Sequence, residues 1–136
     1  MPVRPKLRHY AITVDAEGRP TQEEGGALSW EERWTPEHLV LAALARCSLI
    51  ALGYHARRES LSTRATAQAA GVVGPRANGA WGFVEIDCKV DATVTPPPPA
   101  ARLPALAARA QRGCFVGQSL EPRPQYKWTI NGEEIP

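Results

Sequence analysis

The sequence predicts an α+β fold, with helices packed on one face of a largely antiparallel sheet. Three observations favour it. Residues 81–94 alternate between apolar and polar side chains, as in a strand with one face in a core and the other in water. Residues 39–52 are apolar on nearly every side of a helix, so this helix should be buried. The patterns follow one another in the order strand hairpin, buried helix, two strands, helix, strand.

The N-terminal part of the chain predicts a strand hairpin. Residues 8–14 have strand character, and the turn-forming residues 15–18 would send the chain back. Residues 21–30 are expected to form an edge strand, although the glycines at 25 and 26 weaken its alternation.

The central helix has a clear start signal. Thr35 is a good N-cap, Pro36 suits the first helical position, and Glu37 places a negative charge where the helix dipole favours it. The apolar pattern stops at Gly53, and the polar run that follows indicates an end near Ser60. In so small a domain, a subunit interface is the natural place to bury a helix that is apolar all round.

Two strands should follow this helix, at residues 61–70 and 81–94, with a connecting loop at residues 71–79. The apolar face of the second strand carries alternate residues. They are Val84, Ile86, Cys88, Val90, Ala92 and Val94.

The C-terminal part predicts a shorter helix and a last strand. The prolines at 96–99 form a stiff, extended connection into a helix at 103–112, and Gly113 is placed as its C-terminal cap. Cys114 then lies just beyond a helix end. Residues 125–130 supply the last strand, before an Asn131-Gly132 turn.

Length and charge limit the classes of protein. The 136 residues, of which 43% are hydrophobic, fit a single domain over residues 1–136. The net charge of +2 comes from 16 basic and 14 acidic residues spread along the chain, so nucleic acid is a poor partner. Residues 39–52 are short for a membrane span and contain Arg46, and the N-terminus lacks the apolar core of a signal peptide. We expect a soluble cytoplasmic protein with no membrane partner.

The three cysteines carry the candidate chemistry. An odd number of thiols in a reducing compartment does not predict a structural disulfide framework. Cys88 lies on the apolar face of a strand and is interpreted as packing. Cys47 and Cys114 suggest redox chemistry, provided that other residues activate the thiol. The histidines have no metal-ligand spacing with the cysteines, so no metal site is predicted.

Two motifs resemble those of a known family. Residues 33–52, R-W-T-P-E-H-L-V-L-A-A-L-A-R-C-S-L-I-A-L, resemble the central-helix motif of the OsmC/Ohr family of thiol peroxidases. In that motif a Pro-Glu pair opens the helix and the cysteine follows ten residues after the glutamate, as Cys47 follows Glu37 here. Residues 107–120, A-A-R-A-Q-R-G-C-F-V-G-Q-S-L, are similar to the family's second-cysteine motif. Together the two motifs are specific.

The resemblance implies an OsmC-like intertwined homodimer that reduces organic hydroperoxides, with no metal or haem and no bound cofactor. Cys47 would attack the peroxide and become a sulfenic acid, and Cys114 would condense with it to a disulfide. An external dithiol, a lipoyl group or a similar thiol, would restore both thiols. A reactive thiol needs a nearby cation, and the family carries an arginine after the first strand. Arg19 is the nearest match, with Arg33 and Arg8 as rivals.

Helix geometry adds an expectation about Glu37. In one continuous helix, ten residues at 1.5 Å each would place Glu37 about 15 Å along the axis from Cys47. We therefore expect Glu37 to reach the Cys47 site of the partner subunit, as a two-fold pair of antiparallel helices would allow.

Simpler roles and other functions stay open at this point. Glu37 could merely satisfy the helix dipole, and Cys47 and Cys114 could be inert packing. Aromatic residues at 30, 34 and 115 could line a core or an apolar mouth for bulky peroxides. The chain could also be a non-catalytic OsmC-like redox sensor or small-molecule-binding dimer, or a relative with inert thiols.

Overall fold

The computed structural model describes residues 9, 11–14, 20–22, 26, 28 and 34–136. Contacts within the chain divide it into two compact units, Met1–Thr35 and Pro36–Pro136. The prediction of one domain over residues 1–136 stays a prediction.

The first unit contains a two-stranded antiparallel hairpin. Strand β1 (Ile12–Val14) pairs with β2 (Pro20–Gln22), with Ile12 opposite Gln22 and Val14 opposite Pro20. Both strands are shorter than the predicted ones, which lie partly outside the described residues.

The second unit begins with α1 (Pro36–Arg58), a continuous helix that starts where the sequence predicts. Glu37 lies in its first turn and basic residues lie in its last, so both ends complement the helix dipole. After α1 the chain turns at Ser60, whose φ of 61° takes it out of the helical region. The structure therefore confirms both the start of the predicted helix and its end near Ser60.

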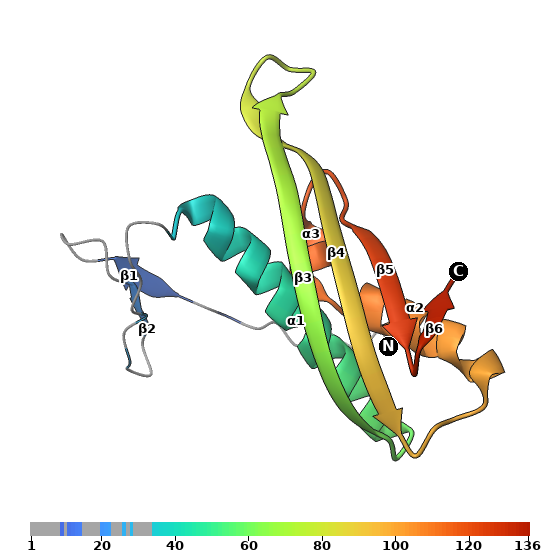
Figure 1. Cartoon of the computed structure of the whole chain (residues 1–136). Helices are drawn as coiled ribbons and strands as arrows, with labels where there is room; N and C mark the ends of the chain where they lie inside the picture. The colour runs from blue at the N-terminus through green and yellow to red at the C-terminus, as the bar shows by residue number, and fades with distance from the viewer. Residues whose placement is uncertain (1–8, 10, 15–19, 23–25, 27, 29–33) are drawn as a thin grey trace, which may run out of the picture. The chain divides into compact units, whose positions relative to one another are not determined.

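Within the second unit, only part of the surface of α1 is covered. Leu44, Ser48 and Leu52 are buried, but Ile50 is 58% exposed and Tyr54 is 49% exposed. By length and composition α1 could also cross a membrane, a test that the core helix of a soluble protein passes as well. Here it packs on β3 and α2, as Figure 1 shows.

Strands of the second unit form one mixed sheet in the order β3-β4-β5-β6. Their bounds are β3 Ser62–Pro75, β4 Trp81–Thr95, β5 Gln125–Ile130 and β6 Glu133–Ile135. β3 with β4 and β5 with β6 are antiparallel, whereas β4 and β5 are parallel. The helices lie on one side of this sheet (Figure 1), which confirms the predicted α+β fold.

The predicted loop at residues 71–79 is wrong in its first half, because β3 continues to Pro75. A Cβ added to Gly71 would lie 2.6 Å from the ring of Phe83 on β4, so glycine lets the two strands pair where a larger residue would clash. A register shift between Val72 and Val73 is accommodated without ending the strand. β3 and β4 therefore form one long hairpin, which reverses at a tight turn between residues 76 and 80.

The connection from β4 to β5 carries η1 (Ala100–Arg102), α2 (Leu103–Arg112) and the short helix α3 (Phe115–Ser119). The sequence predicted α2 with these bounds, but not α3. Gly113 does cap α2, but with a φ of −83°, not in a left-handed conformation. Its Cβ would lie 2.7 Å from Nε2 of His55, so close approach of α1 explains the glycine.

Strand β6 was also not predicted. Asn131 and Gly132 have φ values of 53° and 78°, which suits the tight two-residue hairpin that joins β5 to β6. The core of the second unit lies between the sheet and the helices. Its largest fully buried side chains are Leu44, Leu52, Ile86, Leu103, Leu106, Ile130, Val90, Val94, Cys88, Cys114 and Ser48.

Candidate functional site

Cys47 and Cys114 lie side by side, although they come from different elements. Cys47 is on α1 and partly buried, whereas Cys114 is fully buried and is the N-cap residue of α3. A hydrogen bond joins the two thiols, so the protonation of each affects the other. The structure thus brings together two of the predicted site residues.

The start of α3 explains how both sulfur atoms are held. The first N–H groups of a helix have no partner within the helix, so they can donate to other acceptors. Backbone hydrogen bonds from Phe115 and Val116 reach the Cys47 thiol. The Gly117 N–H donates to Cys114 Sγ over 3.4 Å. Three successive amide groups therefore face the two sulfurs.

Ser48 is the centre of the buried part of this cluster. Its hydroxyl donates to the Leu44 carbonyl at 2.9 Å, and its Oγ lies 3.2 Å from the Tyr126 hydroxyl. The same Oγ lies 3.6 Å from Cys114 Sγ and 3.7 Å from Cys88 Sγ. Ser48 thus links α1 to Cys88 on β4, to Tyr126 on β5 and to Cys114.

Close packing fixes the position of the Tyr126 hydroxyl. The Tyr126 ring stacks on Trp128, with ring centres 5.5 Å apart. A Cβ on Gly117 would lie 2.5 Å from the Tyr126 hydroxyl and 3.3 Å from Cys114 Sγ. Only glycine leaves room for the hydroxyl at this position.

The environment shifts the two thiols of the pair in opposite directions. Burial raises the pKa of Cys47, the hydrogen bond with Cys114 adds to this, and the backbone of Val116 and Phe115 only partly opposes it. Burial also acts to raise the pKa of Cys114, but hydrogen bonds from Tyr126, Gly117 and Ser48 outweigh it, so its pKa lies below the ordinary value. The more exposed thiol is therefore the weaker acid in this chain.

Two further groups of the cluster stay protonated more readily than usual. Burial raises the pKa of Cys88, although the Ser48 hydrogen bond opposes this. Burial also raises the pKa of Tyr126 above its usual range, so its hydroxyl stays a hydrogen-bond donor at neutral pH.

Glu37 and the arginines are not part of the described cluster. Glu37 lies exposed in the first turn of α1. Because α1 is continuous, the expected axial separation of about 15 Å from Cys47 holds within one chain. Arg8, Arg19 and Arg33 lie outside the described residues, as does Trp30. Their predicted roles stay predictions.

Sequence reasoning missed Ser48, Tyr126 and the contact of Cys88 with Ser48. Cys88 is buried on the apolar strand face, as predicted, but it also contacts Ser48. One signal was available: a hydroxyl in an otherwise apolar helical run needs a buried partner. The partner itself depends on the parallel register that places Cys88 opposite Tyr126.

Phe115 and Trp34 are exposed, at 59% and 50%, so neither lies in the core of the described residues. Phe115 directly follows Cys114, and its backbone reaches the Cys47 thiol. An exposed aromatic residue therefore directly follows Cys114 in the chain.

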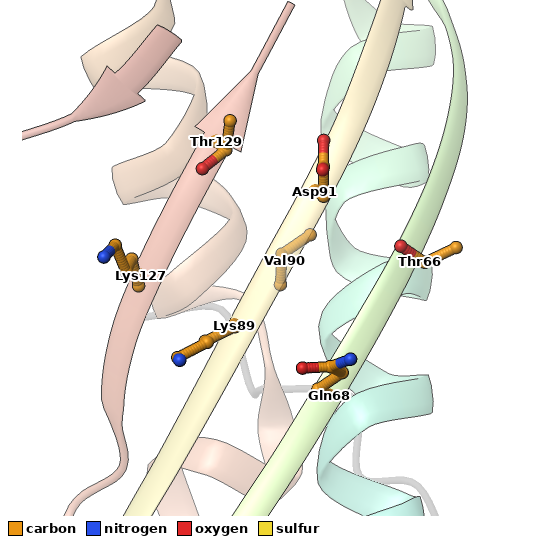
Figure 2. A pocket seen from close by; sticks show the side chains of 7 residues that line it. All are labelled: Thr66, Gln68, Lys89, Val90, Asp91, Lys127 and Thr129. Atoms are coloured by element: carbon orange, nitrogen blue, oxygen red, sulfur yellow. The ribbon is translucent and has the colours of Figure 1, made fainter. Parts of the chain in front are cut away.

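A separate pocket lies on the face of the sheet that points away from the helices and the thiol pair. Its cavity volume is about 260 Å³, and Figure 2 shows side chains from β3, β4 and β5 around it. They are Thr66, Gln68, Lys89, Val90, Asp91, Lys127 and Thr129. None of them is a thiol, so we do not place the candidate site there. Among the described residues, no group of three His, Cys, Asp or Glu side chains could hold a metal ion.

Comparison with known proteins gives one family. The family described as OsmC-like protein matches residues 29–129. A search of curated proteins found no match.

Several solved structures share the fold. An OsmC-like protein of unknown function from Vibrio cholerae has a TM-score of 0.74 at 14% identity, over 90% of this chain and 99% of that chain. An organic hydroperoxide resistance protein from Elizabethkingia anophelis has a TM-score of 0.66 at 17% identity, over 96% of this chain and 100% of that chain. The organic hydroperoxide resistance protein OhrB of Bacillus subtilis has a TM-score of 0.59 at 14% identity, over 93% of this chain and 100% of that chain. At these identities the likeness concerns the fold.

Proposed function

The chain belongs to the OsmC-like protein family, and on this premise we propose that it is a thiol-dependent peroxidase that reduces organic hydroperoxides to alcohols. One observation carries the proposal: the partly exposed thiol of Cys47 shares a hydrogen bond with the buried thiol of Cys114. The names of two structural neighbours, both organic hydroperoxide resistance proteins, support the same substrate class.

Cys47 is the attacking sulfur in this proposal, because it is the only one of the three thiols that is not fully buried. When Cys114 is the ionised member of the pair, the shared hydrogen bond lets the Cys47 proton pass to it as the peroxide arrives, which moves the negative charge to the accessible sulfur. Cys47 Sγ then bonds to the distal peroxide oxygen and the O–O bond breaks. The departing alkoxide takes the proton from Cys114 and leaves as the alcohol, so Cys114 is again a thiolate. The amides of Phe115 and Val116 hold the sulfur, and Arg19 or a rival arginine would add the cation.

Cys114 resolves the sulfenic acid. Its thiolate attacks Cys47 Sγ and displaces hydroxide, which leaves as water, so that a Cys47–Cys114 disulfide forms. An external dithiol then reduces this bond by exchange and is itself oxidised to a disulfide. We place the cycle in the cytoplasm, where such dithiols are kept reduced.

Turnover of cumene hydroperoxide with excess dihydrolipoamide tests this function. We expect many alcohol molecules per chain and faster turnover than with hydrogen peroxide, since the exposed Phe115 favours an apolar substrate. The assay follows loss of peroxide and release of cumyl alcohol against a no-protein control. Equal rates with and without the protein would overturn the proposal.

One observation favours a second function, that of a redox sensor or small-molecule-binding dimer. Burial raises the pKa of Cys47, which lowers its thiolate fraction and thus its reaction rate. In that case one equivalent of peroxide would form the disulfide, but an excess of dithiol would not sustain turnover. The same assay therefore separates the two functions.

We also propose that the chain acts as a homodimer in which Glu37 serves the Cys47 of the partner subunit. Ile50 and Tyr54 leave an apolar surface on α1 that a second copy would cover. Glu37 lies too far along the same continuous helix to reach its own Cys47. A carboxylate from the partner could hold the activating arginine by paired hydrogen bonds.

Mixed dimers test this pairing. We expect Glu37→Gln to lower turnover about tenfold, because the arginine loses its charged partner. A dimer of one Glu37→Gln chain and one Cys47→Ser chain, purified through two different tags, should regain about half of the wild-type activity, since one site keeps both groups. Activity no higher than half that of the Glu37→Gln protein would show that Glu37 serves its own chain.

A further inference from the structure

The Ser48 cluster contains more polar groups than the proposed cycle uses. Ser48 Oγ has four neighbours within hydrogen-bond reach, namely Leu44, Cys88, Cys114 and Tyr126. A serine hydroxyl has one hydrogen to donate and two lone pairs, so it cannot satisfy all four at once. The network must therefore rearrange when a proton enters or leaves it.

The charge on Cys114 decides which arrangement is favoured. When Cys114 is protonated, Ser48 can donate to the Leu44 carbonyl, at 2.9 Å, and accept from two of its other three neighbours. When Cys114 is a thiolate, it accepts only, and Tyr126, Gly117 and Ser48 can all donate to it. The cluster is thus suited to a negative charge on a sulfur atom that water does not reach.

Reduction of the proposed disulfide creates such a charge. A dithiol can reach Cys47, but Cys114 is 0% exposed, so the reductant attacks Cys47 Sγ. A bond forms between the reductant sulfur and Cys47 Sγ, the Cys47–Cys114 bond breaks, and its electron pair goes to Cys114 Sγ. The second thiol of the reductant then releases Cys47 and completes the two-electron reduction. A buried thiolate is costly unless donors surround it.

We propose that Ser48 and Tyr126 are positioning residues that hold Cys114 Sγ and stabilise it as the departing thiolate when the Cys47–Cys114 disulfide is reduced. This inference rests on the proposed function, because it requires that disulfide. The groups that face Cys114 are Cys47 and Ser48 from α1, Cys88 from β4, Tyr126 from β5 and the Gly117 amide from α3. Of these, Tyr126 can lose its donor with the least other change, since phenylalanine keeps the ring that stacks on Trp128.

Tyr126→Phe and Ser48→Ala test the inference, with Ser62→Ala as the control. Ser62 is an exposed serine on β3 whose hydroxyl donates to the Thr95 carbonyl at 3.2 Å. Each protein is oxidised with one equivalent of cumene hydroperoxide, the disulfide is verified by mass spectrometry, and its reduction by dithiothreitol is timed over a range of pH. A lower leaving-group pKa speeds exchange, so Tyr126→Phe should slow reduction about tenfold and Ser62→Ala should not. Ser48→Ala should also slow the reduction of the disulfide.

A second readout distinguishes positioning from a structural role. In the Cys47→Ser background, the ultraviolet absorbance of the Cys114 thiolate is titrated with and without Tyr126→Phe. Loss of a hydrogen bond to a charged group should lower the thiolate fraction about tenfold at a given pH. A merely structural role would change the unfolding midpoint and leave this titration unmoved.

The outcomes separate this inference from the proposed function. If the wild-type protein forms no Cys47–Cys114 bond, both are overturned. If the bond forms, but Tyr126→Phe changes neither its reduction rate nor the Cys114 titration, only the role of Ser48 and Tyr126 is overturned.

Discussion

Replacing Cys47 by serine is expected to abolish peroxide turnover, with a fall of at least about 10³-fold in the rate with cumene hydroperoxide. A serine hydroxyl is almost never ionised at neutral pH, and it forms neither a sulfenic acid nor a disulfide. No other thiol can take over, because Cys88 and Cys114 are both fully buried. Steady-state assays with excess dihydrolipoamide measure the effect.

The other two cysteines provide matched controls with the same atom change. Cys114→Ser should still release about one alcohol per Cys47, after which the sulfenic acid persists and can be trapped with dimedone. Cys88→Ser should keep turnover within about threefold, since the proposed cycle does not use Cys88. Undiminished turnover in Cys47→Ser, or loss of turnover in Cys88→Ser alone, would show that Cys47 is not the reacting thiol.

Ile86→Ala is expected to lower the free energy of unfolding by about 2–5 kcal/mol. Ile86 is only 2% exposed and lies on the inner face of β4, in the core between the sheet and the helices. Removing its outer carbons loses their burial and leaves a cavity that the surrounding strands and helices cannot fill completely. Urea denaturation, followed by tryptophan fluorescence, measures the change.

Val84→Ala is the control for this substitution. Val84 lies two residues before Ile86 and on the same side by alternation, but it is 42% exposed. Its truncation should change the unfolding free energy by less than about 0.5 kcal/mol. Because Val84 could contact a second copy, both variants are measured at two protein concentrations tenfold apart. Equal losses in the two variants at the lower concentration would contradict the described core.

These two positions also show how far alternation carries a prediction. The pattern of residues 81–94 correctly predicted which side chains share one face of β4, because the side chains of a strand alternate by geometry alone. It also placed Val84 with the buried set, which is wrong for this chain. Burial depends on whether another element covers that part of the strand, and the β3–β4 hairpin continues past the helices that cover its base (Figure 1). Gly71 was misread for a related reason, since its close neighbour Phe83 comes from the next strand.

By itself the sequence determined the α+β class, the start of α1 at Pro36, the apolar face of β4, and the two cysteine motifs. Each of these follows from local periodicity, capping preferences or residue spacing, which neighbours in the chain set. Only the tertiary structure decided that Cys114 meets Cys47 at the start of α3, and that Ser48, Tyr126 and Cys88 form one buried cluster. The parallel register of β4 and β5 and the packing of α1 bring these side chains together, and both depend on contacts between residues far apart in the chain.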